Sequence, residues 1–166
     1  MNTKQTYELY VDLDGVIVNF ADHAKELTGI DIDNAGKEDR NLFWKKIERH
    51  VRAGKPFFAG MSQMHDAMHL WNYVLKYHPT ILSATGHIRG AGDEKRMWVR
   101  SNLGSDVANK AIFVRNSRDK AKHASPTAIL IDDRSKSIDP WVEAGGIGIL
   151  HKSAELTIKQ LKELGL

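Results

Sequence analysis

Five short apolar segments, separated by helical patterns, constrain the fold of this chain more than any other feature. Each segment contains β-branched or aromatic residues and is bounded by polar residues or glycine, as buried parallel strands are. They are Tyr7–Val11, Thr80–Leu82, Ala111–Val114, Ala128–Ile131 and Ile147–Leu150. Apolar residues recur near helical spacing in the stretches between them, which are Glu38–Val51, Met64–Val74, Glu94–Leu103 and Ala154–Leu164. Strands that alternate with helices predict an α/β fold around a parallel sheet.

The interval between the first two predicted strands is much longer than a crossover requires. It holds 68 residues, from Asp12 to Pro79, whereas one crossover helix needs far fewer. We expect residues 21–78 to form a small helical cap above the carboxyl end of the first strand. Lys55-Pro56 is a plausible break in the cap, since proline disfavours helix at the residue before it. The chain of 166 residues is otherwise predicted to be a single domain, 1–166.

Composition excludes several classes of protein. The chain has no cysteine, so disulfides and cysteine-bound metals are excluded. Residues Met1–Glu8 are polar and lack the apolar segment of a signal peptide. No stretch approaches the roughly 20 apolar residues of a membrane span, and a charged fraction of 27% is ordinary for a folded domain. We therefore expect a cytoplasmic protein that does not associate with membranes; the sequence leaves the oligomeric state open.

Positive charge is concentrated in residues 87–123. This stretch contains nine lysines and arginines against four acidic residues. A local excess of positive charge attracts phosphorylated small molecules or nucleic acid. The alternative interpretation is an ordinary solvated surface.

Carboxylates follow two of the predicted strands. Asp12 and Asp14 follow the first strand, and Asp132-Asp133 follow Ala128–Ile131. Ligands of parallel α/β sheets bind beyond the carboxyl ends of the strands. Two like charges about 4 Å apart repel by roughly 4 kcal/mol at an effective dielectric constant near 20, so a cluster there requires a cation or raised pKa values. Oxygen donors alone favour Mg²⁺; the alternative for either pair is a turn.

These residues resemble the haloacid dehalogenase-like superfamily. Asp12-x-Asp14-Gly15-Val16 resembles its motif I, Ile81-Leu82-Ser83 its motif II, and Ile129–Asp133 its motif IV, while Lys122 or Lys120 resembles the lysine of motif III. The 5'(3')-deoxyribonucleotidase branch is more similar still, through segments in the same order along nearly the whole chain. They are Asp12–Phe20, Lys55–Phe58, Trp98-Val99 with Leu103-Gly104, Arg118–Lys120 and Leu130–Arg134.

The resemblance implies a Rossmann-like three-layer α/β fold and a Mg²⁺-dependent phosphatase. Asp12 would be the nucleophile that forms an aspartyl-phosphate. Asp14 would donate a proton to the leaving group and then activate water. The implied Mg²⁺ site, in which Asp133 orients metal-bound water, comprises Asp12, the Leu13 carbonyl, Asp14, Asp132 and Asp133.

The resemblance also implies the groups that bind phosphate. They are the hydroxyl of Ser83, backbone N–H groups near Gly15 and Ala84, and the motif III lysine. Lys122 is favoured for that lysine because it precedes Asp132 by ten residues, whereas Lys120 keeps the Arg-Asp-Lys context. The branch usually has serine at position 84, and Thr85 is the candidate replacement for its hydroxyl.

The substrate is the least constrained part of the prediction. Phe20 aligns with an aromatic residue that contacts the nucleobase in the branch, and Phe43 and Trp44 are candidates to complete an aromatic clamp; the alternative is that these rings form the core of the cap. The foremost prediction is a 5'(3')-(deoxy)ribonucleotidase. A phosphatase of polynucleotide 5'- or 3'-ends is the second, and a non-catalytic nucleotide or nucleic-acid binding protein the third.

Overall fold

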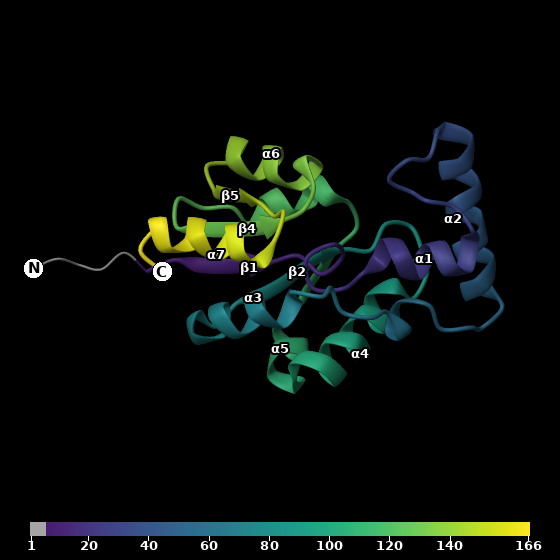
Figure 1. The fold of residues 1–166 in the computed structure, drawn as a ribbon, viewed down its shortest axis with the longest axis horizontal. Helices are drawn as coiled ribbons and strands as arrows, with labels where there is room; N and C mark the ends of the chain where they lie inside the picture. The colour runs from purple at the N-terminus through teal and green to yellow at the C-terminus, as the bar shows by residue number, and fades with distance from the viewer. Residues whose placement is uncertain (1–5) are drawn as a thin grey trace, which may run out of the picture.

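The computed structural model describes residues 6–166, in which five parallel strands form a sheet in the order β3-β2-β1-β4-β5. Residues 1–5 of the polar start lie outside the described part. The strands are β1 Glu8–Val11, β2 Thr80–Ala84, β3 Ile112–Val114, β4 Ala128–Asp132 and β5 Ile147–Leu150. Each coincides with a predicted apolar segment, and helices cover both faces of the sheet (Figure 1). The predicted three-layer α/β fold is confirmed.

Alternation along the strands divides the core into two layers. Leu9 and Val11 of β1 belong to the larger cluster, which holds the buried side chains of α3 (Ala67–Val74), α4 (Ala91–Leu103) and α7 (Ala154–Glu163). Tyr10, between them, packs on the opposite face against α6 (Ser135–Glu143) through Trp141. Successive side chains of a strand point to opposite faces. The central strand is therefore apolar at every position that a helix covers.

Three helices were not delimited by the sequence patterns, and the first of them has clear local start and stop signals. The helix α1 (Phe20–Thr28) begins at Asn19, whose side chain accepts a hydrogen bond from the Asp22 N–H, and ends at Gly29 in the left-handed region. The short helix α5 (Ser105–Lys110) follows α4 after Gly104. The third is α6, which contains Trp141.

The insertion after β1 carries α1 and α2 (Lys37–Arg52) and a 3₁₀ turn, η1 (Phe58–Gly60). Figure 1 shows α1 and α2 beyond the carboxyl end of the sheet, opposite the described ends of the chain. The two connections to this cap lie side by side, because the Asn19 N–H donates to Ser62 and the Met64 N–H donates to Ile17. The predicted cap range, 21–78, also includes α3, which packs against α7 and lies with the sheet.

None of the helices in residues 6–166 combines the length and the apolarity that crossing a bilayer requires.

Candidate active site

The carboxyl ends of β1 and β4 bring the predicted aspartates together. Val11 pairs with Ile131, so the residues that follow, Asp12 and Asp132, lie side by side at the carboxyl edge of the sheet. Both are buried, and Asp133 is partly buried. One oxygen from each of these three carboxyl groups lies within 4.8 Å of the others. Desolvation, followed by repulsion from Asp132, raises the pKa of Asp12 well above its ordinary value. The same two causes raise the pKa of Asp133 to about 6.

The cation inside this cluster is Lys120. Its Nζ lies 2.8 Å from Asp12 Oδ1 and 2.6 Å from Asp132 Oδ2. Burial opposes the charge of this ammonium, but Asp12 and Asp132 raise the pKa of Lys120 above its ordinary value. The lysine therefore stays protonated and neutralises part of the negative charge of the cluster.

Lys122, which the ten-residue spacing favours, lies outside the cluster, and the preference for it is corrected. Its side chain is 75% exposed and pairs with Asp119 at 3.1 Å, whereas that of Lys120 is 2% exposed. Both lysines belong to the 3₁₀ helix η3 (Ser117–His123). With about three residues per turn, side chains two positions apart point in different directions. Only one of the two can face the carboxylates.

A second buried lysine, Lys95 on α4, was not predicted. Its Nζ lies 2.6 Å from Asp14 Oδ2, 2.7 Å from the Ala84 carbonyl and 3.2 Å from Ser83 Oγ. The signal in the sequence is its position on a helix, because Lys95 precedes Trp98 and Val99 by three and four residues and lies on the same buried face. A lysine on the apolar face of a helix has to find a partner in the interior.

Glu94, the neighbour of Lys95, holds the returning end of the cap. Its Oε2 accepts hydrogen bonds from the backbone N–H groups of Phe57, Phe58 and Ala59. This contact was also not predicted, because it joins two segments about 36 residues apart.

The turn after β1 overturns two of the expected roles. The Leu13 carbonyl accepts the N–H groups of Ile17 and Val18, both at 2.9 Å, so it faces the turn instead of a metal ion. The Gly15 N–H donates to the Val18 carbonyl and is not free to bind phosphate. Gly15 has φ +77°, and a Cβ there would lie 2.1 Å from Asp133 Oδ2. Glycine thus permits the close approach of this turn to the carboxylates.

The carboxylate cluster has the chemistry of a divalent-cation site. Within the described residues, Asp14 Oδ1 and Asp133 Oδ1 are buried without a hydrogen-bond partner. Oxygen atoms alone are offered by Asp12, Asp132 and Asp133, and hard cations such as Mg²⁺ prefer such donors. Asp12, Asp132 and Asp133 therefore fit a metal ion of this class, which would supply the missing partner of Asp133 Oδ1.

The end of β2 faces the same site through Ser83, whose side chain is buried beside Lys95. Ala84 contributes its carbonyl to Lys95. The hydroxyl of Thr85 donates to the Val114 carbonyl at 3.2 Å, so it is directed towards β3. The expectation that Thr85 replaces a missing hydroxyl is corrected for this reason.

The predicted aromatic residues divide into a buried and an accessible group. Phe43 is completely buried and packs edge-on against Phe20, so its expected contact with substrate is corrected to a role in the cap core. Phe20 and Trp44 are partly exposed and stack with their centroids 6.0 Å apart. Trp44 also lies edge-on to His87, in the loop that follows β2, with centroids 6.4 Å apart. These two rings thus lie where the cap faces the end of the sheet.

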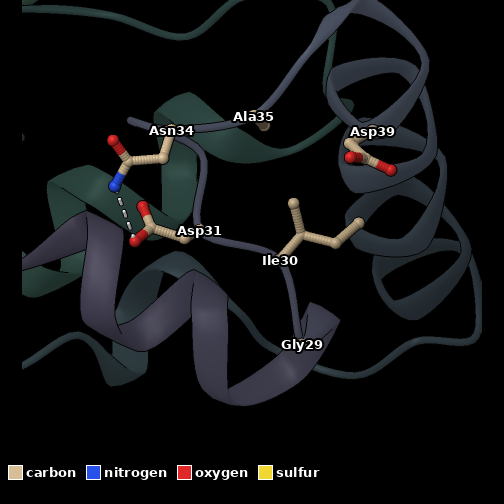
Figure 2. Close-up of a pocket in the computed structure, with 6 residues that line it drawn as sticks. All are labelled: Gly29, Ile30, Asp31, Asn34, Ala35 and Asp39. Carbon is tan, nitrogen blue, oxygen red and sulfur yellow. Dashed lines mark hydrogen bonds between the residues drawn. The ribbon is translucent and has the colours of Figure 1, made fainter.

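A separate hollow of about 350 Å³ lies in the loop between α1 and α2 (Figure 2). Figure 2 shows Asn34 donating to Asp31, while Asp39 lies across the hollow on α2. Among residues 6–166, no lysine or arginine lines it, and none of the predicted site residues does. Asp31 and Asp39 line the hollow, and Asp31 already pairs with Lys25 at 3.7 Å, so this lining is unsuited to a phosphate group.

Several solved structures of hydrolases are similar to this chain in fold. A hydrolase from Streptococcus pneumoniae TIGR4 is 14% identical, with a TM-score of 0.54, over 95% of this chain and 99% of that one. A HAD family hydrolase from Deinococcus radiodurans R1, with bound phosphate and sodium, is 12% identical, with a TM-score of 0.56, over 93% and 88%. A HAD-superfamily hydrolase from Ehrlichia chaffeensis is 11% identical, with a TM-score of 0.55, over 99% and 100%.

The fold is similar to that of solved HAD-superfamily hydrolases. No protein-family model and no curated protein matches the sequence. The likeness to the haloacid dehalogenase-like fold extends over nearly the whole chain, as the resemblance of the sequence motifs implies, and identity this low supports the fold alone.

Proposed function

We propose that this protein is a metal-dependent phosphomonoester hydrolase in which Asp12 is the nucleophile. The observation that carries the proposal is the position of Lys120, whose ammonium lies between Asp12 and Asp132 at the carboxyl edge of the sheet. A nucleophilic carboxylate has to approach an anionic phosphoryl group, so a fixed cation beside it lowers the electrostatic cost. The HAD-like fold supports the same chemistry by analogy.

The residues that would hold Mg²⁺ are Asp12, Asp132 and Asp133. When bound, the ion would neutralise the carboxylates and the phosphoryl oxygens during transfer. Of the direct ligands that the resemblance implies, this set retains the side chains of Asp12 and Asp132. Asp133 takes the place of the Leu13 carbonyl, and Asp14 is not part of the set.

The reaction proceeds in two halves. The carboxylate of Asp12 attacks phosphorus, and Asp14 donates a proton to the departing alkoxide oxygen. Asp14 then accepts a proton from water as the water hydrolyses the aspartyl-phosphate, which releases phosphate and regenerates Asp12. The hydroxyl of Ser83 donates to a phosphoryl oxygen throughout, and Lys120 offsets the charge of the group being transferred.

The substrate we propose is a nucleoside monophosphate, hydrolysed as in a 5'(3')-nucleotidase. Trp44 is partly exposed and lies edge-on to His87 in the loop that follows β2, the strand that contains Ser83. Phe20 stacks against Trp44 and Phe58. Stacking on an aromatic side chain contributes about 1–3 kcal/mol per base and tolerates any base. The partly exposed ring of Trp44 supports a planar substituent on the phosphate ester.

Polynucleotide ends are the second candidate substrate, favoured by one observation. Four exposed arginines follow the strands at the carboxyl edge: Arg89 after β2, Arg115 and Arg118 after β3, and Arg134 after β4. No ion pair involves them within residues 6–166. Free cations around a phosphatase site suit a substrate with additional phosphates.

The test is phosphate release in the presence of Mg²⁺ from 5'- and 3'-mononucleotides and from 5'- and 3'-phosphorylated oligonucleotides. We expect mononucleotides to be hydrolysed, with turnover lower by about 10³-fold or more in Asp12→Asn. Higher activity on oligonucleotides that falls steeply with salt would select the second candidate. Unchanged turnover in Asp12→Asn would exclude the mechanism. Inactivity on all substrates would exclude both, leaving a non-catalytic binding protein.

A further inference from the structure

The ammonium of Lys95 uses all its donors inside the protein. Asp14, Ser83 and the Ala84 carbonyl accept one hydrogen bond each, and the side chain is only 2% exposed. An ammonium has three N–H donors, so none remains for a substrate. Lys95 therefore acts on other side chains and not on the phosphate group itself.

We propose that Lys95 is a positioning residue that orients Asp14 for proton transfer, an inference that rests on the proposed function. Lys95 occupies Asp14 Oδ2, while Asp14 Oδ1 is buried without a partner. The contact leaves one carboxyl oxygen free to exchange a proton with the leaving group or with water. By donating also to Ser83, the same ammonium fixes the distance between the proton donor and the phosphate-binding hydroxyl.

Lys95 also joins this pair to the cap. Its Nζ lies 5.2 Å from the centroid of the Phe58 ring, a cation–π contact. The backbone N–H of Phe58 is held by Glu94, the preceding residue of α4. Glu94 thus binds the returning end of the cap, and Lys95, the next residue of α4, binds Asp14. The orientation of Asp14 is therefore fixed by α4, which packs on the sheet, independently of the turn after β1 that contains Asp14.

The first test is chemical rescue in Lys95→Ala. We expect kcat to fall 10- to 100-fold while KM changes less than threefold, because Lys95 has no donor free for the substrate. Propylammonium replaces the missing part of the side chain and should restore at least a fifth of the lost kcat. Tetramethylammonium has the charge but no N–H donor and should restore nothing. A KM effect alone, or equal effects of the two cations, would overturn the proposal.

The matched control is Arg100→Met, an exposed cation on the same helix that donates to Asn109. Its kcat and KM should remain within twofold of the wild type, and propylammonium should have no effect on it. If Lys95→Ala behaves like this control while Asp12→Asn is inactive, the proposed function holds and the positioning role fails.

A second measurement does not require activity. We expect Lys95→Met to lower Tm by several degrees in the wild-type background and by less than half as much in Asp14→Asn, because the ion pair is already weakened there. Equal losses of Tm in the two backgrounds would show that Lys95 does not act through Asp14 and would overturn the proposal. If wild-type protein hydrolyses no phosphomonoester, the proposed function fails, and the role of Lys95 in catalysis fails with it.

Discussion

The Nζ atom of Lys120 lies 2.8 Å from Oδ1 of Asp12, although 108 positions separate the two residues in the chain. Asp12 leaves β1 and Lys120 lies in η3, the segment between β3 and β4. Their contact depends on β1 and β4 being neighbours in the sheet. The charge balance of the site is thus a consequence of strand order.

The two lysines of η3 should differ sharply when replaced. Lys120→Met should lower turnover by about 10²–10³-fold, since a preorganised charge beside the nucleophile is lost. Lys122→Met should stay within twofold of the wild type, because that side chain is exposed and pairs with Asp119. Steady-state phosphate release from both variants measures the difference. The reverse order would restore the assignment based on the ten-residue spacing.

Lys120→Met should also be less stable, because two buried carboxylates lose their cation. Removing one partner of a buried ion pair costs about 3–5 kcal/mol. Protonation relieves that cost, so the difference in Tm from the wild type should narrow as the pH falls from 7 to 5. A difference independent of pH would mean that packing and not charge causes the loss.

Mg²⁺ should stabilise the folded protein. A ligand that binds only the folded state adds about 2.7 kcal/mol at a concentration 100 times its Kd, so Tm should rise with added Mg²⁺ and return to its original value with EDTA. Asp132→Asn should lose this shift and most of the activity together. Thermal unfolding across a Mg²⁺ titration checks both; a full shift in Asp132→Asn would exclude Asp132 as a ligand.

The stability of the metal-free protein should fall as the pH rises from about 4 to about 6. Burial and Asp132 raise the pKa of Asp133 from 3.8 to about 6, so the folded state binds this proton more tightly than the unfolded state does. Full ionisation then costs about 3 kcal/mol. Asp133→Asn should flatten this part of the profile of Tm against pH in EDTA. An unchanged slope would contradict the assignment to Asp133.

Two neighbouring aromatic residues on α2 should have different roles. Trp44→Ala should raise KM for nucleoside monophosphates about tenfold, from the loss of stacking, and leave KM for ribose 5-phosphate, which has no aromatic ring, within twofold. Phe43→Ala should instead lower stability by about 3–5 kcal/mol, because Phe43 is completely buried. Kinetics with both substrates and denaturant unfolding of both variants separate the cases. Equal KM changes for the two substrates would exclude a base-binding role of Trp44.

Much of the scaffold was predictable because its signals are local. The alternation of apolar strands and amphipathic helices predicts the sheet, and β5 matches its predicted range, Ile147–Leu150, residue for residue. The placement of Asp12 and Asp132 at strand ends required only the rule that parallel strands present their carboxyl ends on one edge. Hydrophobic periodicity carries this information without knowledge of distant contacts.

The remaining parts of the site depend on contacts that no local pattern contains. The carbonyl of Leu13 and the N–H of Gly15 were expected to bind ligands, but the turn uses both in its own hydrogen bonds. The hydroxyl of Thr85 is likewise taken by the neighbouring strand. Spacing identifies a residue as a candidate, whereas the direction of its polar group is set by the backbone partners that folding supplies.

The amino-acid sequence by itself determined the α/β class, the strand-end carboxylates and the insertion after β1, because each follows from residue types at short range. Only the tertiary structure decided which lysine meets Asp12, that Lys95 holds Asp14, and that Phe43 lies inside the cap while Trp44 remains partly exposed. These outcomes depend on the closure of loops between distant segments. A buried charge is then stabilised only by a partner that the completed fold brings within hydrogen-bond distance.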